Sequence, residues 1–248
     1  MIRKLVLILM VALPIVAAGQ DKPSEKDPIQ QYRVEATEKW EAEIAKLEAQ
    51  DRSQPDPQEA ILFIGSSSIR RWTDLDADLS PRKTVNRGYG GAKFSDLAVY
   101  IDRIVNPHQF KALVIFVGND IVGKPEDKTP AEVARLFKYI VGQVRKTHAT
   151  QPIFLLAVTP TPSRFKAWPT IRQANAELAK VCESEKSVYF IPTEKFYLDE
   201  AGKPIEKYFV EDQLHQNREG YQVWSRIVRE HLDRVLGAAL TDRENRRE

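Results

Sequence analysis

The sequence predicts one α/β domain in which a mostly parallel sheet lies between two layers of helices. Short apolar segments alternate with longer amphipathic ones along the chain, an order typical of parallel strands joined by helices. The first strand candidate, over 60–64, is apolar throughout, as expected where both faces of a sheet are covered. A length of 248 residues, with 42% hydrophobic and 29% charged content, suits one globular domain with a substantial core.

The first residues predict an export signal. Arg3 and Lys4 precede an apolar run over 5–18, and small residues near its end suit cleavage, so we interpret residues 1–19 as a signal peptide. The run is shorter than the roughly 20 residues of a membrane-spanning helix, and an uncleaved anchor is the alternative. Loss of Arg3 and Lys4 lowers Lys plus Arg from 37 to 35, equal to the 35 Asp plus Glu. We therefore expect a periplasmic or extracellular protein with no nucleic acid partner and no stable membrane insertion after cleavage.

The rest of the chain is predicted to have three parts. Residues 20–58 form a polar linker and an N-terminal helix, residues 59–240 form the α/β domain, and residues 241–248 form a charged tail. Five strands are predicted, over 60–64, 84–86, 112–117, 152–158 and 187–191. Pro55 and Pro57 separate the first strand from the preceding helix.

Four helices are predicted, over about 31–50, 130–147, 171–185 and 217–235. The second has the clearest amphipathic stripe, which includes Val133, Phe137 and Val144. The last begins at Asn217, whose side-chain oxygen suits an N-terminal cap.

This order of elements predicts where chemistry takes place. In open parallel sheets, ligands bind in the loops that follow the carboxyl ends of the strands. Ser67, the glycines near residue 90, Asn119 and the loop over 159–168 each follow a predicted strand. We therefore expect four loops to meet at one edge of the sheet.

Two motifs at opposite ends of the chain point to nucleophilic catalysis. Gly-Ser-Ser-Ser at 65–68 follows the first strand, and Asp-Gln-Leu-His at 212–215 places a carboxylate three residues before an imidazole. A serine hydroxyl becomes a good nucleophile when a base takes its proton, and a carboxylate holds the tautomer of that base. Each motif alone is more often a turn or a helix cap. Together they predict a serine esterase.

Two further segments complete a family resemblance. Glycines at 88, 90 and 91 follow the second strand, and Gly-Asn-Asp at 118–120 follows the third. With the two motifs above, they resemble the four sequence blocks of the SGNH (GDSL-type) hydrolases over about residues 60–236. The resemblance implies a flavodoxin-like, three-layer α/β/α sandwich.

The resemblance also implies a catalytic triad. Ser67 corresponds to the family's nucleophile, Asp212 to its acid and His215 to its base. Ser66 takes the place of an aspartate that is usual in the family but is not the triad acid. No cofactor is implied.

An oxyanion hole is implied in the same way. Its donors correspond to the backbone N–H groups of Ser67 and Gly91 and to the side-chain amide of Asn119, with Gly90 as the alternative to Gly91. Gly118 adjoins Asn119 directly, one residue closer than in the usual pattern.

The substrate is the least determined part of the prediction. The resemblance implies an ester or thioester, and short-chain acyl esters, lysophospholipids and acetylated carbohydrates all stay open. Tyr89, Arg164 and Trp168 are candidate substrate-binding residues, and the loop over 159–168 is either a wall of the substrate site or a solvated connection. Tyr89, Trp168 and Trp72 could stack on sugars if exposed, although a core position is the more common one for each.

Two other functions use the same residues differently. One is a non-catalytic polysaccharide-binding module on the same fold, and the other is an acyltransferase that passes the acyl group to an alcohol. A metal site is not predicted, because the four histidines (108, 148, 215 and 231) lack paired-ligand spacing. The lone Cys182 excludes an intramolecular disulfide and is interpreted as a buried, inert thiol. The oligomeric state is not predicted.

Overall fold

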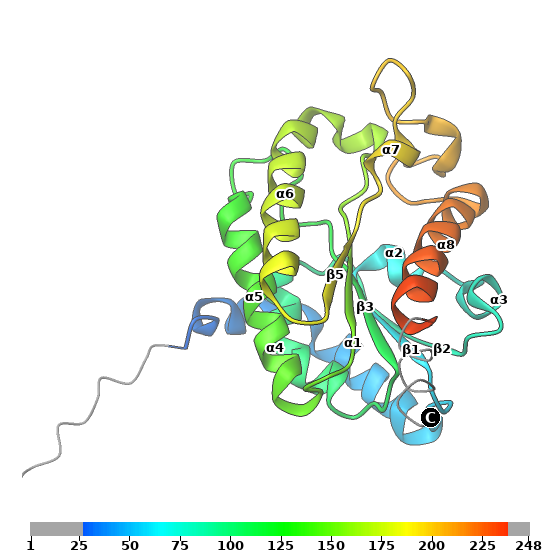
Figure 1. Cartoon of the computed structure of the whole chain (residues 1–248). Coiled ribbons are helices and arrows are strands. Elements are labelled where there is room, and N and C mark those ends of the chain that lie inside the picture. Colours follow the sequence, from blue (N-terminus) through cyan, green and yellow to red (C-terminus); the bar gives the residue numbers. More distant parts are fainter. Residues whose placement is uncertain (1–26, 238–248) are drawn as a thin grey trace, which may run out of the picture.

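The computed structural model describes residues 27–237, and its centre is a five-stranded sheet (Figure 1). The strands are β1 (Ile61–Gly65), β2 (Thr84–Gly88), β3 (Ala112–Phe116), β4 (Ile153–Leu156) and β5 (Val188–Ile191). Their order across the sheet is β2-β1-β3-β4-β5, and every neighbouring pair is parallel. The strand order reverses at β1 and β3, so a ligand crevice is expected beyond the carboxyl ends of these two strands.

Helices cover both faces of the sheet. They are α1 (Arg33–Ser53), α2 (Ser67–Arg70), α3 (Leu75–Leu79), α4 (Phe94–Val105), α5 (Pro130–Thr147), α6 (Trp168–Ser184), α7 (Glu194–Tyr197) and α8 (Arg218–Leu232). Short 3-10 helices are η1 (Gln30–Tyr32), η2 (Pro162–Ala167) and η3 (Glu206–Tyr208), and a π-helical turn, η4, covers Asp233–Gly237. Helices α1, α4, α5 and α6 form one layer, and α3 and α8 form the other (Figure 1). The predicted three-layer α/β/α architecture is confirmed.

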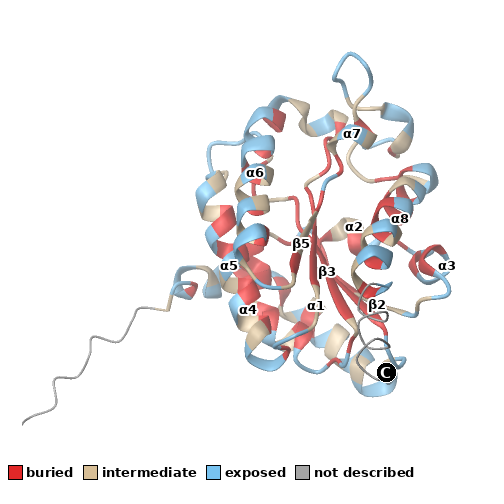
Figure 2. Ribbon diagram, in the orientation of Figure 1, coloured by how far each residue is buried: buried red, intermediate tan, exposed pale blue. Residues whose placement is uncertain are grey.

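Side-chain alternation along β1 divides the core between these layers. Leu62 and Ile64 belong to the cluster shared with α1, α4, α5 and α6, whereas Ile61 and Phe63 belong to the cluster shared with α3 and α8. All four side chains are fully buried. The sheet is accordingly buried, while the outer faces of the helices are exposed (Figure 2). This double cover explains why the strand β1 is apolar throughout.

The predicted strands are all present, with ends that differ by at most two residues. Helix α5 has the predicted bounds, and the Asn217 side chain caps α8 by accepting the N–H of Gly220 at 3.1 Å. Helix α6 begins at Trp168 rather than at 171, with a proline in its first turn. Helix α8 ends at Leu232 and continues as the π-helical turn.

Helix α4 was not predicted. Its apolar residues recur at helical spacing, since Phe94, Leu97, Ile101 and Ile104 are all buried. At the start of α4, the Asp96 carboxylate accepts the backbone N–H of Lys93 at 2.9 Å. The signal was therefore present in the sequence.

Helix α1 is part of the same core, although the sequence placed it before the α/β domain. Trp40 and Ile44 are buried in the cluster of the first layer. On the side facing α4, the Arg103 guanidinium lies 2.9 Å from Glu41 and 2.7 Å from Glu48. Apolar burial and ion pairs thus fix α1 against α4.

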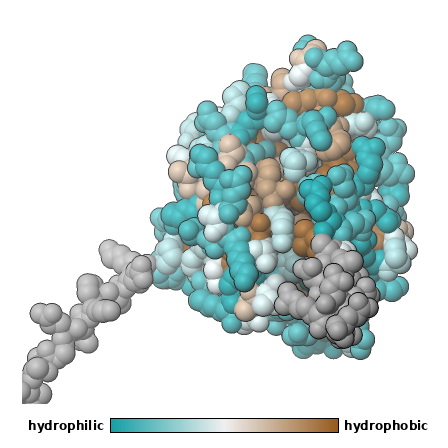
Figure 3. All heavy atoms as spheres, viewed as in Figure 1, coloured by the Kyte–Doolittle hydropathy of each residue, from teal (hydrophilic) through white to brown (hydrophobic). Residues whose placement is uncertain are grey.

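Some predictions fall outside the described residues, namely the signal peptide at 1–19 and the charged tail at 241–248. Within residues 27–237, no helix is long and apolar enough to cross a membrane. The face shown in Figure 3 is largely hydrophilic, with apolar side chains visible between the polar ones. Cys182 is buried as predicted, and burial raises the pKa of its thiol to about 12.

Candidate active site

The turn after β1 places Ser67 at the expected edge of the sheet. Gly65 adopts a φ of +137°, and a Cβ at this position would lie 1.9 Å from the carbonyl oxygen of Phe116. The next residue, Ser66, donates its N–H to that same carbonyl at 3.0 Å. Only glycine allows this close approach, after which the chain enters α2 at Ser67.

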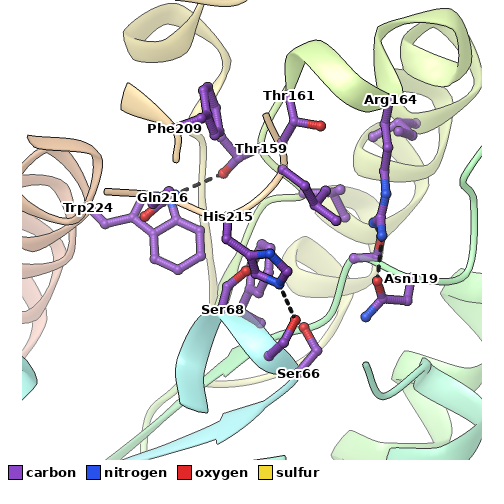
Figure 4. Close-up of a pocket in the computed structure, with 16 residues that line it drawn as sticks. Ser66, Ser68, Asn119, Thr159, Thr161, Arg164, Phe209, His215, Gln216 and Trp224 are labelled. Atoms are coloured by element: carbon purple, nitrogen blue, oxygen red, sulfur yellow. Dashed lines mark hydrogen bonds between the residues drawn. The ribbon is translucent and has the colours of Figure 1, made fainter. Parts of the chain in front are cut away.

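The predicted triad residues lie in hydrogen-bonding contact. His215 Nε2 is 2.9 Å from Ser67 Oγ, a contact drawn as the dashed line at His215 in Figure 4. On the other side of the ring, His215 Nδ1 is 2.7 Å from Asp212 Oδ2. An ionised carboxylate only accepts hydrogen bonds, so Nδ1 carries the hydrogen in this pair. Nε2 is then the ring nitrogen that can accept a proton from Ser67.

The loop over residues 210–215, which carries Asp212 and His215, is held together by hydrogen bonds within itself. The second carboxylate oxygen, Asp212 Oδ1, accepts the backbone N–H groups of Leu214 at 2.9 Å and His215 at 2.8 Å. Val210 donates its N–H to the carbonyl of His215 at 2.8 Å, and Gln213 takes a positive φ of 53°. A spacing of three residues therefore brings carboxylate and imidazole together without help from distant elements.

The same contacts set the charge of Asp212. Burial opposes its ionisation, but hydrogen bonds from the backbone and ring of His215 and from the Leu214 N–H outweigh that effect and lower the pKa of Asp212 to about 2. The Arg71 guanidinium adds a cation 3.5 Å from Oδ2. Asp212 is therefore ionised at neutral pH.

Three of the predicted oxyanion donors are available for a ligand. Asn119 Nδ2 donates one hydrogen to the carbonyl of Ala92 at 3.0 Å and keeps the other. Among residues 27–237, no acceptor takes the backbone N–H of Ser67 or of Gly91. A Cβ on Gly91 would lie 3.9 Å from Asn119 Nδ2, which places that glycine beside the amide.

Gly90 has a different environment. Its N–H donates to the Glu43 carboxylate of α1 at 3.0 Å, and its φ is +30°. A Cβ at Gly90 would lie 1.8 Å from the Trp40 ring. Gly90 therefore serves the turn and its contact with α1, and Gly91 is the glycine with a free donor.

A small cavity of about 30 Å³ adjoins these groups. Its polar lining includes Ser67, Asn119, Arg164 and His215, and its apolar lining includes Phe116, Val158, Ile171, Phe209, Leu214 and Trp224 (Figure 4). One wall is rigidly placed, because the buried Trp224 indole donates to the Thr159 hydroxyl at 3.1 Å. The cavity therefore leaves room for a small group beside Ser67.

The predicted substrate-binding residues occupy two different places in the structure, one at the cavity and two in the core. Arg164 lines the cavity and hydrogen-bonds Asn119. Tyr89 and Trp168 are 1% and 6% exposed and belong to the core, so neither offers a stacking surface; Trp72 is 1% exposed and is likewise buried. The sugar-stacking role considered for these aromatic residues is therefore corrected.

Some residues of the site were not predicted. Phe209 and Trp224 line the cavity, and the Ala92 carbonyl holds the Asn119 amide. Trp224 lies on the apolar stripe of α8, so its sequence pattern indicates only a core position. The described residues contain no group of three or more His, Cys, Asp or Glu side chains able to hold a metal ion.

The comparison with known families agrees with this geometry. The model of the GDSL-like lipase/acylhydrolase family matches residues 54–223, more than half of the chain. The chain belongs to this family. No curated protein matches it significantly.

Solved structures of several bacterial proteins share the fold of this chain. A Streptococcus pneumoniae protein described as a proposed platelet activating factor is 22% identical, with a TM-score of 0.69 over 82% of this chain and 96% of its own. A proposed acylhydrolase from Bacteroides fragilis is 20% identical, with a TM-score of 0.65 over 86% and 100%. A catalytic mutant of an acetylxylan esterase from Geobacillus stearothermophilus is 16% identical, with a TM-score of 0.56 over 70% and 93%. Family membership and these esterase neighbours support an ester-hydrolysing enzyme.

Proposed function

We propose that this GDSL-family protein is an exported serine esterase that cleaves carboxylic esters through an acyl-enzyme. The observation that carries the proposal is the continuous relay of hydrogen bonds from Ser67 Oγ to His215 Nε2 at 2.9 Å and from His215 Nδ1 to Asp212 Oδ2 at 2.7 Å. No cofactor takes part in the proposed reaction.

Each proton transfer in the proposed reaction passes through His215. Ser67 Oγ attacks the ester carbonyl carbon while Nε2 takes the hydroxyl proton, and ionised Asp212 stabilises the imidazolium. The intermediate then expels the alcohol, which receives the proton from Nε2. Water repeats the sequence on the acyl-enzyme, giving the carboxylic acid and free Ser67.

Negative charge develops on the carbonyl oxygen during both steps. The unpaired N–H groups of Ser67 and Gly91, and the remaining hydrogen of the Asn119 amide, support their assignment as oxyanion donors. Donors already held in place cost little reorganisation as the charge forms.

The proposed substrate is an ester with a short acyl group. The small cavity beside Ser67 supports an acetyl group in preference to a long acyl chain enclosed by the protein. Acetylated carbohydrates therefore fit the site better than lysophospholipids with long chains, in keeping with the acetylxylan esterase among the structural neighbours. Export through residues 1–19 would bring the enzyme to such polymers.

The runner-up function, a polysaccharide-binding module, has less support. It relied on exposed aromatic residues, and Tyr89, Trp72 and Trp168 are buried. Acyl transfer to an alcohol uses the same acyl-enzyme, and measuring product partition between water and added alcohols would distinguish it from hydrolysis.

The first test is the intact mass of the protein after exposure to a fluorophosphonate. We expect one adduct on the wild type and none on Ser67→Ala, because only an activated serine reacts readily with this probe. The neighbouring Ser68→Ala is the matched control and should still be labelled. An unlabelled wild type that is correctly folded would reject the esterase and favour the binding module.

A further inference from the structure

Arg164 makes contacts that a simple substrate-binding residue would not need. It lies on η2, beyond the carboxyl end of β4, and reaches the loop that follows β3 (Figure 4). Its Nη2 donates to Asn119 Oδ1 at 2.7 Å, and its Nη1 donates to the carbonyl oxygen of Gly118. One planar guanidinium thus holds both the side chain of Asn119 and the backbone just before it.

These contacts fix the orientation of the Asn119 amide. A positively charged donor at Oδ1 and a carbonyl acceptor, Ala92 O, 3.0 Å from Nδ2 allow only one assignment of oxygen and nitrogen. The Ala92 contact alone leaves the amide able to pivot about that single bond. Adding Arg164 holds the opposite end, so the second amide hydrogen points in one direction.

The Arg164 guanidinium is partly buried, and its hydrogen bonds go to two neutral oxygens, Gly118 O and Asn119 Oδ1. Burial lowers the pKa of Arg164 from its ordinary value, while the charge of Asp127 opposes this effect. Its positive charge therefore lies beside the Asn119 amide, where the proposed reaction develops negative charge. A hydrogen bond from this cation also polarises the amide and strengthens its remaining N–H as a donor.

The segment that carries Arg164 also contacts the catalytic histidine loop. Ser163, the preceding residue, donates its N–H to the carbonyl of Gln213 at 3.1 Å. Gln213 lies between Asp212 and His215. Two consecutive residues of η2 therefore contact the two sides of the site, the oxyanion side and the base side.

We infer that Arg164 is a positioning residue: its guanidinium orients and polarises the Asn119 amide so that the free N–H of that amide meets the oxyanion. The inference rests on the proposed esterase function. It gives Arg164 a role through Asn119 instead of through direct contact with substrate.

The kinetic test compares Arg164→Met with Asn119→Ala and with the double variant, using p-nitrophenyl acetate. Loss of one oxyanion donor typically lowers kcat about 10²–10³-fold, and we expect Arg164→Met to lose roughly 10-fold to 10²-fold in kcat with little change in KM. The double variant should be no slower than Asn119→Ala alone, since Arg164 acts through that amide. Lys166→Met removes a positive charge from an exposed position on the same 3-10 helix and should leave kcat unchanged.

Arg164→Lys and chemical rescue by added guanidinium provide two further tests of this role. Lysine keeps the charge but lacks the planar pair of donors, so kcat should fall although the protein folds normally. Millimolar guanidinium should partly restore kcat to Arg164→Met and have no such effect on Asn119→Ala. A double variant whose loss equals the product of the two single losses would overturn the inference, as would full kcat in Arg164→Met.

A structural measurement tests the positioning without relying on turnover. In ¹H–¹⁵N spectra, the Asn119 side-chain amide, identified by its loss in Asn119→Ala, should show slow hydrogen exchange in the wild type and fast exchange in Arg164→Met. Unchanged exchange would overturn the positioning role even in an active enzyme. A separate result would reject the esterase proposal, namely ester hydrolysis by Ser67→Ala at the wild-type rate.

Discussion

Enlarging the cavity beside Ser67 should change the acyl length that the enzyme prefers. Ile171, from α6, is 3% exposed and contributes to the apolar lining. Ile171→Ala removes three carbons, which at about 0.8 kcal/mol each gives roughly 2.4 kcal/mol before the cost of the cavity left behind. We expect a loss of about 3 kcal/mol in the free energy of unfolding, which a domain of this size can withstand at room temperature.

The larger cavity should change which substrate the enzyme hydrolyses best. A methylene accepted or rejected by an apolar pocket is worth about 1–3 kcal/mol, or roughly 10–200-fold in kcat/KM. The ratio of kcat/KM for p-nitrophenyl butyrate to that for the acetate should therefore rise at least about tenfold in Ile171→Ala. The assay follows initial release of p-nitrophenolate across acetate, butyrate and hexanoate.

Ile140→Ala is the matched control. Ile140, on α5, is fully buried in the same core cluster but does not line the cavity. It should lose similar stability and keep the acetate preference of the wild type. An unchanged butyrate-to-acetate ratio in Ile171→Ala, or a wild type that hydrolyses the hexanoate as well as the acetate, would refute the assignment of this cavity to the acyl group.

Four other variants test neighbouring parts of the protein. Asn119→Ala should lower kcat about 10²–10³-fold with a normal melting temperature, and near wild-type kcat in steady-state assays would remove it from the oxyanion hole. Burial raises the pKa of Asp120 to about 6 against the opposing effects of Lys128 and the Phe94 N–H, so the folded state binds this proton more tightly than the unfolded chain. The free energy of unfolding should then fall as pH rises from about 4 to 6. In thermal melts, Asp120→Asn should show a smaller decline over that range than the wild type. Parallel declines in the two proteins would contradict the raised pKa. Gly90→Ala should lower the melting temperature, because its Cβ would overlap the Trp40 ring and its φ is positive. Gly91→Ala should keep the melting temperature and lower kcat. Equal melting temperatures for the two variants would contradict this difference.

The sequence predicts the central strands β1 and β3 well, because strands covered on both faces are apolar without interruption. The edge strand β2 carries a weaker signal, since Asn86 and Arg87 interrupt its apolar residues. The missed α4 has an equally regular pattern. Its start at Phe94 lies only three residues after the glycine turn at 90–91.

The site is predictable only where its parts are close in the chain. Asp212 and His215 are joined by a loop whose own hydrogen bonds bring them together, so their spacing is informative. The contact between Arg164 and Asn119 joins residues 45 positions apart, and no periodicity or spacing marks it. The burial of Trp168 is similarly a matter of tertiary packing, since the same residue type serves cores and sugar sites alike.

The contacts of Gly90 with α1 bear on where this enzyme can be cut. Helix α1 ends at Ser53, and the family match begins at residue 54, so sequence similarity excludes the whole helix. Yet Glu43 and Trp40 of α1 hold the turn whose next residue, Gly91, presents the free N–H. An expression boundary drawn at the start of the family match would keep every matched residue and remove the contacts that hold the turn before Gly91, a proposed oxyanion donor. The folded unit that holds the candidate site is therefore longer, at its N-terminal side, than the part by which its family is identified.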